Sequence, residues 1–99
     1  MADFFFKLTG PRPTFVADMT PEERVLMQQH GVYWREGLQR GNVLVFGLVA
    51  DPSGPYGMGI VRFTTEAEAR SFADGDPTIQ SNQGFRIDIS PMPMGAVYS

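Results

Sequence analysis

Four segments of the chain are rich in apolar residues and have the length of β-strands. Phe4–Leu8 and Val43–Ala50 are apolar almost without interruption, and Gly57–Phe63 is a third such segment. Phe85–Ile89 alternates between apolar and polar residues, which is typical of a strand with one buried face. We therefore predict four strands.

A helix is predicted between the first two strands, because both of its ends carry the expected signals. Thr20 is suited to the N-cap, Pro21 to the first helical position, and Glu23 completes a capping box with Thr20. The helix should continue to about Arg40, and Gly41 should end it.

A shorter helix is predicted between the third and fourth strands. Thr65 and Glu68 repeat the capping-box spacing, the helix should run to about Ala73, and the turn-forming residues 74–77 should end it. The resulting order predicts an α+β fold of the ferredoxin-like βαββαβ type, with a four-stranded antiparallel sheet and both helices on one face. The 99 residues should form a single domain, 1–99.

The first two predicted strands, Phe4–Leu8 and Val43–Ala50, do not alternate, so both of their faces are apolar. Two helices cover only one side of the sheet, and an uncovered apolar face of this kind is larger than soluble monomers usually carry. We therefore predict a homodimer in which the two sheets meet face to face. The alternative is that the proline-rich loop after the first strand and the C-terminal tail, Pro91–Ser99, cover this face within one subunit.

The composition is that of an ordinary globular protein, with 42% hydrophobic and 19% charged residues. The net charge of -3 and the single lysine, Lys7, argue against a nucleic-acid partner, which needs clustered basic residues. The absence of cysteine excludes disulfides and zinc–thiolate sites, and one histidine is too few for a histidine-rich metal site. No apolar segment approaches the about 20 residues that cross a membrane, so we expect no membrane partner. We also expect no metal and no cofactor. Because Asp3 stands where a signal peptide carries positive charge, we expect a cytoplasmic protein.

The only histidine, His30, lies in the middle of the first predicted helix. Helical spacing places it on one face with Leu26, Tyr33, Trp34 and Gly37, and this face should pack toward the sheet. Imidazole is the side chain whose ordinary pKa lies nearest to neutrality, which makes it the usual proton-transfer group. His30 is therefore either a hydrogen-bonded core residue or one member of an acid–base pair.

Two aspartates are candidates to pair with His30 or to border a site. Asp76 follows the second predicted helix, and a carboxylate there would fix the tautomer of the imidazole and stabilise its charged form. Asp51 follows the second predicted strand, whose end would border a cavity. Both aspartates precede proline, where aspartate is also an ordinary turn residue, so both interpretations stay open for each of them.

Several short motifs occur in a fixed order along the chain. They are Glu23-Arg24-x5-His30-x2-Tyr33-Trp34-x6-Gly41, Val45-Phe46-Gly47-Leu48-Val49-Ala50-Asp51-Pro52, Phe72-Ala73-Asp74-Gly75-Asp76-Pro77 and Pro91-Met92. From Phe4 to Pro91, the chain resembles the YCII-related family. The resemblance implies a fold similar to that of muconolactone isomerases and other dimeric α+β barrel proteins, in agreement with the predicted dimer. Relatives often have Gly-Pro where this chain has Gly47-Leu48, so the floor of the site is expected to differ.

The resemblance also implies a His/Asp pair in a cavity, which His30 and Asp76 match, and some relatives catalyse dehydrochlorination or related eliminations on small ring compounds. We therefore expect a cofactor-free enzyme of lyase or isomerase type that acts on a small cyclic or carbonyl compound. His30 would be the general base or acid, and Asp76 would orient it. One alternative is a ligand-binding or accessory module of the same fold without chemistry. Another is a dimer whose aromatic face serves only assembly, which predicts no cavity beside His30. The other residues expected to wall or border the site are Tyr33, Trp34, Arg24 and Asp51.

Overall fold

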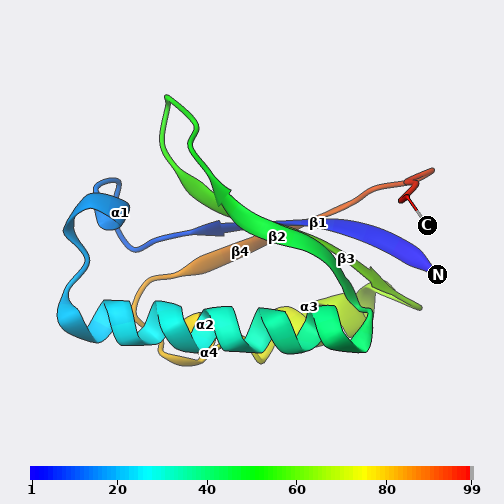
Figure 1. Ribbon diagram of the computed structural model, residues 1–99, viewed down its shortest axis with the longest axis horizontal. Helices are drawn as coiled ribbons and strands as arrows, with labels where there is room; N and C mark the ends of the chain where they lie inside the picture. Colours follow the sequence, from blue (N-terminus) through cyan, green and yellow to red (C-terminus); the bar gives the residue numbers. More distant parts are fainter. Residues whose placement is uncertain (99) are drawn as a thin grey trace.

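Over residues 1–98, which the computed structural model describes, the chain forms a four-stranded antiparallel sheet with helices packed on one of its faces (Figure 1). The order of the strands is β2-β3-β1-β4, and each neighbouring pair is antiparallel. The architecture confirms the predicted α+β fold of the ferredoxin-like type. Residue 99, the last residue of the predicted C-terminal cover, lies outside the described residues. The strands are β1 (Ala2–Thr9), β2 (Val43–Val49), β3 (Tyr56–Phe63) and β4 (Arg86–Pro91).

Helix α2 (Pro21–Arg40) begins and ends where the sequence predicts. The Thr20 hydroxyl accepts a hydrogen bond from the backbone N–H of Glu23 at 3.1 Å, and the Glu23 carboxylate accepts one from the N–H of Thr20 at 2.9 Å. Gly41 ends the helix in the left-handed region, with a φ of 85°, where glycine is the least strained residue. These signals act within a few residues of the helix ends, which is why the sequence was sufficient to predict them.

Helix α3 (Glu66–Asp74) also begins with its predicted capping box, and a single-turn helix, α4 (Pro77–Gln80), follows it. Another single turn, α1 (Phe15–Asp18), lies between β1 and α2. Neither single turn was predicted, because one turn of helix is too short to show a periodic pattern. Residues 74–77 therefore end α3 as predicted, and in addition they begin α4.

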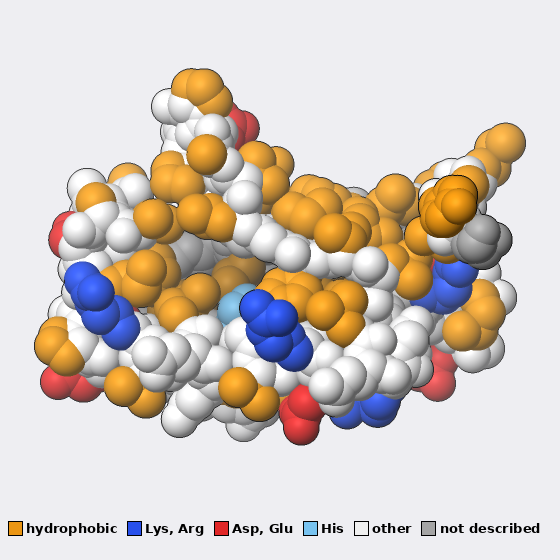
Figure 2. All heavy atoms as spheres, viewed as in Figure 1, with side chains coloured by type: hydrophobic (Ala, Val, Ile, Leu, Met, Phe, Trp, Pro, Cys, Tyr) orange, Lys and Arg blue, Asp and Glu red, His pale blue; other side chains and the backbone are white. Residues whose placement is uncertain are grey.

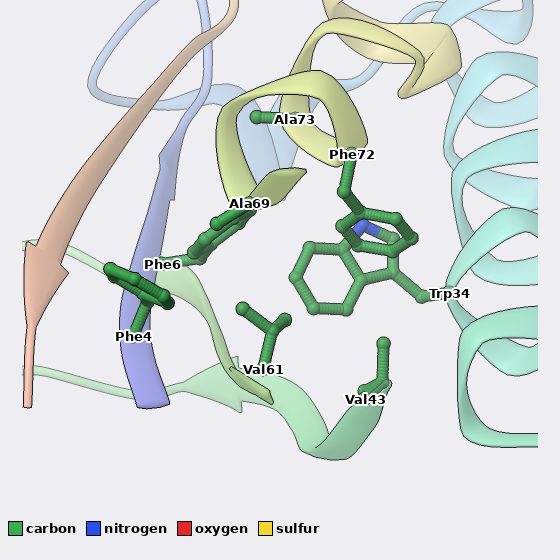
Figure 3. Packing of buried hydrophobic residues seen from close by; sticks show 8 residues of the cluster. All are labelled: Phe4, Phe6, Trp34, Val43, Val61, Ala69, Phe72 and Ala73. Atoms are coloured by element: carbon green, nitrogen blue, oxygen red, sulfur yellow. The ribbon is translucent and has the colours of Figure 1, made fainter. Parts of the chain in front are cut away.

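The core lies between the sheet and the helices, and its centre is aromatic (Figure 3). The indole of Trp34, on α2, packs edge-on against Phe6 of β1 and Phe72 of α3, with ring centroids 5.6 and 5.0 Å apart. Gly59 of β3 permits this close approach, because a Cβ atom there would overlap the benzene ring of the indole. The indole is therefore held by aromatic neighbours on two sides and by the backbone of the sheet.

The face of the sheet that points away from the helices, called here the outer face, is partly apolar and partly charged. Phe5 of β1 pairs directly with Ile60 of β3, which in turn pairs with Val45 of β2, so three apolar side chains form a row across the strands. Val45 is 50% exposed. Beside this row, Arg62 forms an ion pair with Asp3 across the strands, with 2.6 Å between Nε and Oδ1. The outer face is thus less uniformly apolar than the first two strands alone predict.

Within residues 91–98, the C-terminal tail lies beside Asp3 at the edge of the outer face. The backbone N–H of Met92 donates to the carbonyl of Asp3 at 2.9 Å, which keeps the start of the tail beside β1. Beyond this point Met94 and Tyr98 are 101% and 98% exposed, whereas side chains that covered the sheet would lose most of their exposure. Met94 and Tyr98 therefore do not cover the apolar row, in which Val45 is exposed.

Candidate functional site

A cavity of about 680 Å³ lies between the N-terminal half of α2 and one end of the sheet. Its walls come from α2, from the segment between β1 and α2 that contains α1, from the β2–β3 hairpin and from the start of β4. Figure 2 shows this hollow with the histidine side chain at its edge. The expectation of no cavity beside His30, which followed from a face that serves only assembly, is wrong. Most of the lining is apolar and includes Phe6, Phe15, Met19, Met27, Trp34 and Phe46.

His30 and Asp76 are hydrogen-bonded at the edge of this cavity, although they lie 46 residues apart in the sequence. The distance between His30 Nδ1 and Asp76 Oδ2 is 2.8 Å. Helix α2 carries His30, and Asp76 is the N-cap of α4, which packs against α2. The His30 side chain is 13% exposed and lines the cavity, whereas the Asp76 side chain is fully buried. The imidazole therefore lies between a buried carboxylate and an open cavity.

Each oxygen of the Asp76 carboxylate accepts two hydrogen bonds. Oδ2 accepts from His30 Nδ1 and from the indole Nε1 of Trp34, the latter at 2.7 Å. Oδ1 accepts from the backbone N–H of Thr78 at 2.9 Å and from its hydroxyl at 2.8 Å. A buried carboxylate is costly unless it is hydrogen-bonded in this way, and these four bonds fix both of its oxygens.

Two opposing effects act on the pKa of Asp76. Burial raises it, but the hydrogen bonds from His30, Trp34 and Thr78 stabilise the charged carboxylate and outweigh burial, so the pKa of Asp76 lies below its usual value. An ionised carboxylate has only acceptor oxygens, which assigns the shared proton to Nδ1 of His30. In the neutral imidazole the other nitrogen, Nε2, then carries a free lone pair. Within residues 1–98, only Nδ1 of this ring is hydrogen-bonded.

The other four predicted site residues are divided by the structure. Trp34 lines the cavity, but Tyr33, Arg24 and Asp51 are not part of its lining within residues 1–98. Tyr33 stacks on the ring of Phe72 at 4.8 Å and donates its hydroxyl to the carbonyl of that residue at 2.7 Å. It therefore points to α3, whereas Trp34, the next position along the helix, faces the cavity.

Arg24 is exposed on the first turns of α2, and Asp51 belongs to the turn between β2 and β3. The Asp51 carboxylate accepts hydrogen bonds from the backbone N–H and the hydroxyl of Ser53, at 2.9 and 2.7 Å. Of the two interpretations left open for Asp51, the structure therefore shows the turn. Roles of Tyr33, Arg24 and Asp51 in binding a substrate remain predictions.

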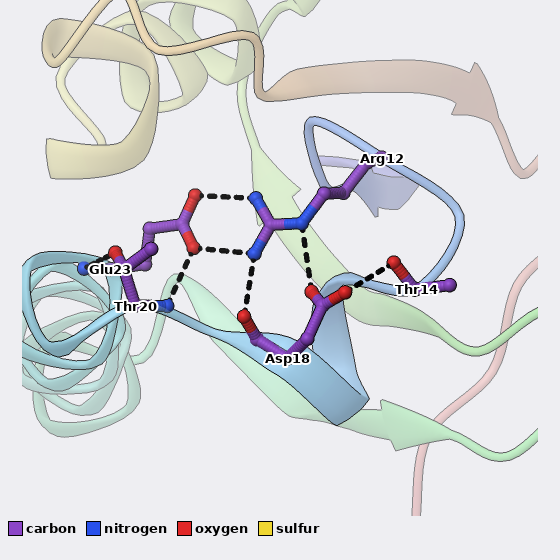
Figure 4. Close-up of polar contacts among 5 residues, drawn as sticks. All are labelled: Arg12, Thr14, Asp18, Thr20 and Glu23. Atoms are coloured by element: carbon purple, nitrogen blue, oxygen red, sulfur yellow. Dashed lines mark hydrogen bonds and ion pairs between the residues drawn. The ribbon is translucent and has the colours of Figure 1, made fainter.

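Arg12 ties the outer wall of the cavity to helix α2 (Figure 4). Its guanidinium donates two hydrogen bonds to the Glu23 carboxylate and two to Asp18, one of them to the backbone carbonyl, and all four are 2.8 Å long. The hydroxyl of Thr14 donates to the other oxygen of the Asp18 carboxylate at 2.6 Å. Arg12 and the backbone N–H of Thr20 lower the pKa of Glu23 to about 2. The segment between β1 and α2 is thus bound to the first turn of the helix.

Sequence reasoning missed two residues of this site. Thr78 holds Oδ1 of Asp76, and the signal for it was present, because an aspartate before proline often accepts a hydrogen bond from the residue two positions later. Arg12 carries no comparable signal. Its partner Glu23 lies 11 residues away, beyond the range of any local pattern.

Within residues 1–98, no three His, Asp or Glu side chains are grouped so as to hold a metal ion, and no helix combines the length and the apolar character needed to span a membrane. Among curated proteins, none has a sequence that matches this chain significantly. A family model does match: the YCII-related domain aligns with residues 4–93, which include both His30 and Asp76. The chain therefore belongs to the YCII-related domain family.

Proposed function

We propose that this protein is a small acid–base enzyme for a small cyclic or carbonyl compound, in which His30 transfers a proton and Asp76 orients it. The observation that carries the proposal is the 2.8 Å hydrogen bond between His30 Nδ1 and Asp76 Oδ2 at the edge of the cavity. This bond commits Nδ1 to the protein interior, so Nε2 is the nitrogen available to a bound molecule. Asp76 also stabilises the charge that the imidazole acquires when it takes up a proton.

The chemistry that this arrangement supports is removal of a proton from a carbon next to a carbonyl group. Nε2 of the neutral imidazole takes the proton, and the electron pair of the broken C–H bond moves toward the carbonyl. In an isomerisation, the substrate carries a C=C bond beside the deprotonated carbon; the imidazolium returns the proton to the far carbon of that bond, and the C=C bond shifts toward the carbonyl group. In an elimination, the electron pair instead forms a C=C bond with the adjacent carbon, whose leaving group departs with its bonding electrons. After an elimination, the imidazolium releases its proton to water or to the leaving group, so both sequences balance without a cofactor.

The cavity supports this proposal by its size and lining. Its volume of about 680 Å³ lies within the range of about 300–1,000 Å³ typical of small-molecule sites. Trp34 and Phe46, whose ring centroids are 5.7 Å apart, provide apolar surface next to His30. An apolar lining around one proton-transfer group is what a small, largely apolar ring compound requires.

We further propose that the protein forms a homodimer through the outer faces of two sheets. The apolar row of Phe5, Ile60 and Val45 crosses three strands, and its Val45 side chain is 50% exposed. The Asp3–Arg62 ion pair beside the row is satisfied within one subunit, so association does not leave an unpaired charge there. A cytoplasmic location is also part of this proposal, supported by the lack of cysteine, because small secreted domains are typically rich in disulfides.

A test of the acid–base function does not require the natural substrate. The protein is incubated in D₂O with a panel of five- and six-membered lactones and cyclic ketones, and the loss of their C–H signals next to the carbonyl is followed by proton NMR. His30→Asn keeps a side-chain N–H that can donate to Asp76 but removes Nε2. We expect the wild-type protein to accelerate exchange of at least one compound and His30→Asn to lower that rate by about 10²–10⁴-fold.

Gln29→Asn is the matched control, because Gln29 is an exposed neighbour on the same helix and lies outside the cavity lining. This variant should exchange the compound at the wild-type rate. Equal rates in His30→Asn and wild type would refute the role of Nε2. Compounds that bind in the cavity without any exchange would favour the alternative, a ligand-binding or accessory module.

A further inference from the structure

The proposed acid–base pair needs only His30 and Asp76, yet a third side chain bonds to the same carboxylate oxygen. The indole N–H of Trp34 donates to Asp76 Oδ2 at 2.7 Å, next to the bond from His30 Nδ1 at 2.8 Å. The aromatic rings around Trp34 would keep it in the core even without this bond. The bond therefore calls for its own explanation.

We infer that Trp34 is a positioning residue, whose indole N–H holds Asp76 Oδ2 in place for His30, and that Gly59 holds the indole. This inference rests on the proposed function, because it describes how Asp76 is kept in the position that orients His30. It concerns the N–H group of the indole rather than the apolar ring that faces the cavity.

The carboxylate is fixed from two directions by groups that do not move with a substrate. Thr78 binds Oδ1 through its backbone N–H and its hydroxyl, so rotation of the carboxylate is already restricted on that side. Trp34 binds Oδ2 and is only 3% exposed. His30, at 13% side-chain exposure and on the cavity wall, is the donor whose second ring nitrogen is available to a bound molecule. The imidazole must therefore align with an oxygen whose position is set by the interior of the protein.

Gly59 is part of this arrangement because it has no side chain. The indole lies so close to β3 that any side chain at position 59 would displace the ring. On the other sides, Phe6 and Phe72 pack edge-on against the ring at 5.6 and 5.0 Å. A displaced indole would carry its N–H away from Oδ2, since a tryptophan ring moves as a rigid unit.

The N–H of Trp34 also affects where the proton resides. A hydrogen bond to a charged carboxylate stabilises that form, so the indole helps to keep Asp76 ionised when His30 becomes charged. The proton taken from a substrate then stays on the imidazole, from which it can be returned. A phenylalanine at position 34 would preserve apolar packing and lose this effect.

The test compares three variants by NMR titration of the ¹³C signal of the Asp76 carboxyl group. Trp34→Phe removes the donor, and Gly59→Ala keeps the donor but displaces it. Phe72→Leu is the control, because it weakens the packing around the indole without removing a hydrogen bond to Asp76. We expect the midpoint of the carboxyl titration to rise by about one pH unit in Trp34→Phe and Gly59→Ala, the size of one lost bond to a charged group, and to stay unchanged in Phe72→Leu.

A second measurement needs no variant. Trp34 is the only tryptophan, so its indole N–H gives a single NMR signal in the wild-type protein. This signal should move with the same midpoint as the Asp76 carboxyl group. An indole signal that ignores the titration, or a carboxyl midpoint in Trp34→Phe equal to that in Phe72→Leu, would overturn the inference. Neither readout involves turnover. Equal exchange rates in His30→Asn and the wild-type protein would therefore refute the proposed enzyme without changing the result for the Trp34–Asp76 bond.

Discussion

Replacing Asp76 with asparagine perturbs the site with the smallest possible change in shape. The side chain is fully buried, and its two oxygens accept four hydrogen bonds, from His30, Trp34 and twice from Thr78. Asparagine keeps one acceptor oxygen and replaces the other with an NH₂ group. Two of the four donors therefore lose their acceptor, whichever way the amide is turned.

The expected loss of stability follows from that count. A buried donor without an acceptor costs about 1–3 kcal/mol, so two of them cost about 2–6 kcal/mol. His30 can relieve one of them if its proton moves to Nε2, because Nδ1 then accepts from the new NH₂ group. One donor then remains without an acceptor, so we expect Asp76→Asn to lower the free energy of unfolding by about 1–3 kcal/mol. A loss of this size is a substantial part of the roughly 5–15 kcal/mol that is the free energy of unfolding of an ordinary domain. The same shift of the proton to Nε2 would also remove the basic lone pair from the cavity.

Urea unfolding at neutral pH, followed by circular dichroism and by the fluorescence of the single tryptophan, measures this difference. Asp51→Asn is the control, because Asp51 occupies a turn at the surface and asparagine forms the same kind of turn. It should change the free energy of unfolding by less than about 0.5 kcal/mol. If Asp76→Asn costs less than about 1 kcal/mol, or no more than Asp51→Asn, the four-bond account of the carboxylate is wrong.

Two further predictions concern the cavity wall and the outer face. The pKa of Glu23 is about 2 in the folded protein, against an ordinary value of 4.5, so its pairing with Arg12 stabilises the fold fully above pH 4.5 and less and less as the pH falls toward 2. In Glu23→Gln, the free energy of unfolding should fall less between pH 4.5 and pH 2 than in the wild-type protein. Urea unfolding at a series of pH values measures this, and equal losses in the variant and the wild-type protein would contradict the pairing. Val45→Lys should convert the proposed dimer to a monomer in sedimentation velocity, because association would bury an unpaired charge. Val32→Lys, at a 60% exposed position on α2, should leave it dimeric, and a monomeric wild-type protein or a dimeric Val45→Lys would refute the interface.

Much of the fold was predictable because its signals are local. The capping boxes at Thr20 and Thr65 each involve groups three residues apart, and Gly41 ends α2 through its own backbone angle. The outer face was harder to predict. Nothing in the run of phenylalanines in β1 shows that Phe4 is buried while Phe5 faces outward, or that Arg62 pairs with Asp3 beside it. Which side of such a strand is covered is decided by helices far away in the sequence.

The site depends on contacts of longer range. Helical spacing placed His30 and Trp34 on the face that packs toward the sheet, but it contains no information on where Asp76 lies. The family resemblance pointed to that residue, and the structure brings the two side chains to 2.8 Å across 46 residues. The shared acceptor of His30 and Trp34 depends on the packing of α4 against α2, which neither helix encodes alone.

The two ends of the cavity are held by different physical means, and this difference bears on how the protein would work. At the inner end, Asp76 is fixed by bonds to Thr78 that also begin α4, so the orientation of the carboxylate is a consequence of folding. At the outer end, the wall that contains α1 is tied to α2 through Arg12 and Glu23, and the Arg12 side chain is 34% exposed. An ion pair that water can reach contributes less and opens more readily than a buried network. The outer wall is therefore the part of the site more exposed to local opening, while the acid–base pair at the inner end is held by buried hydrogen bonds.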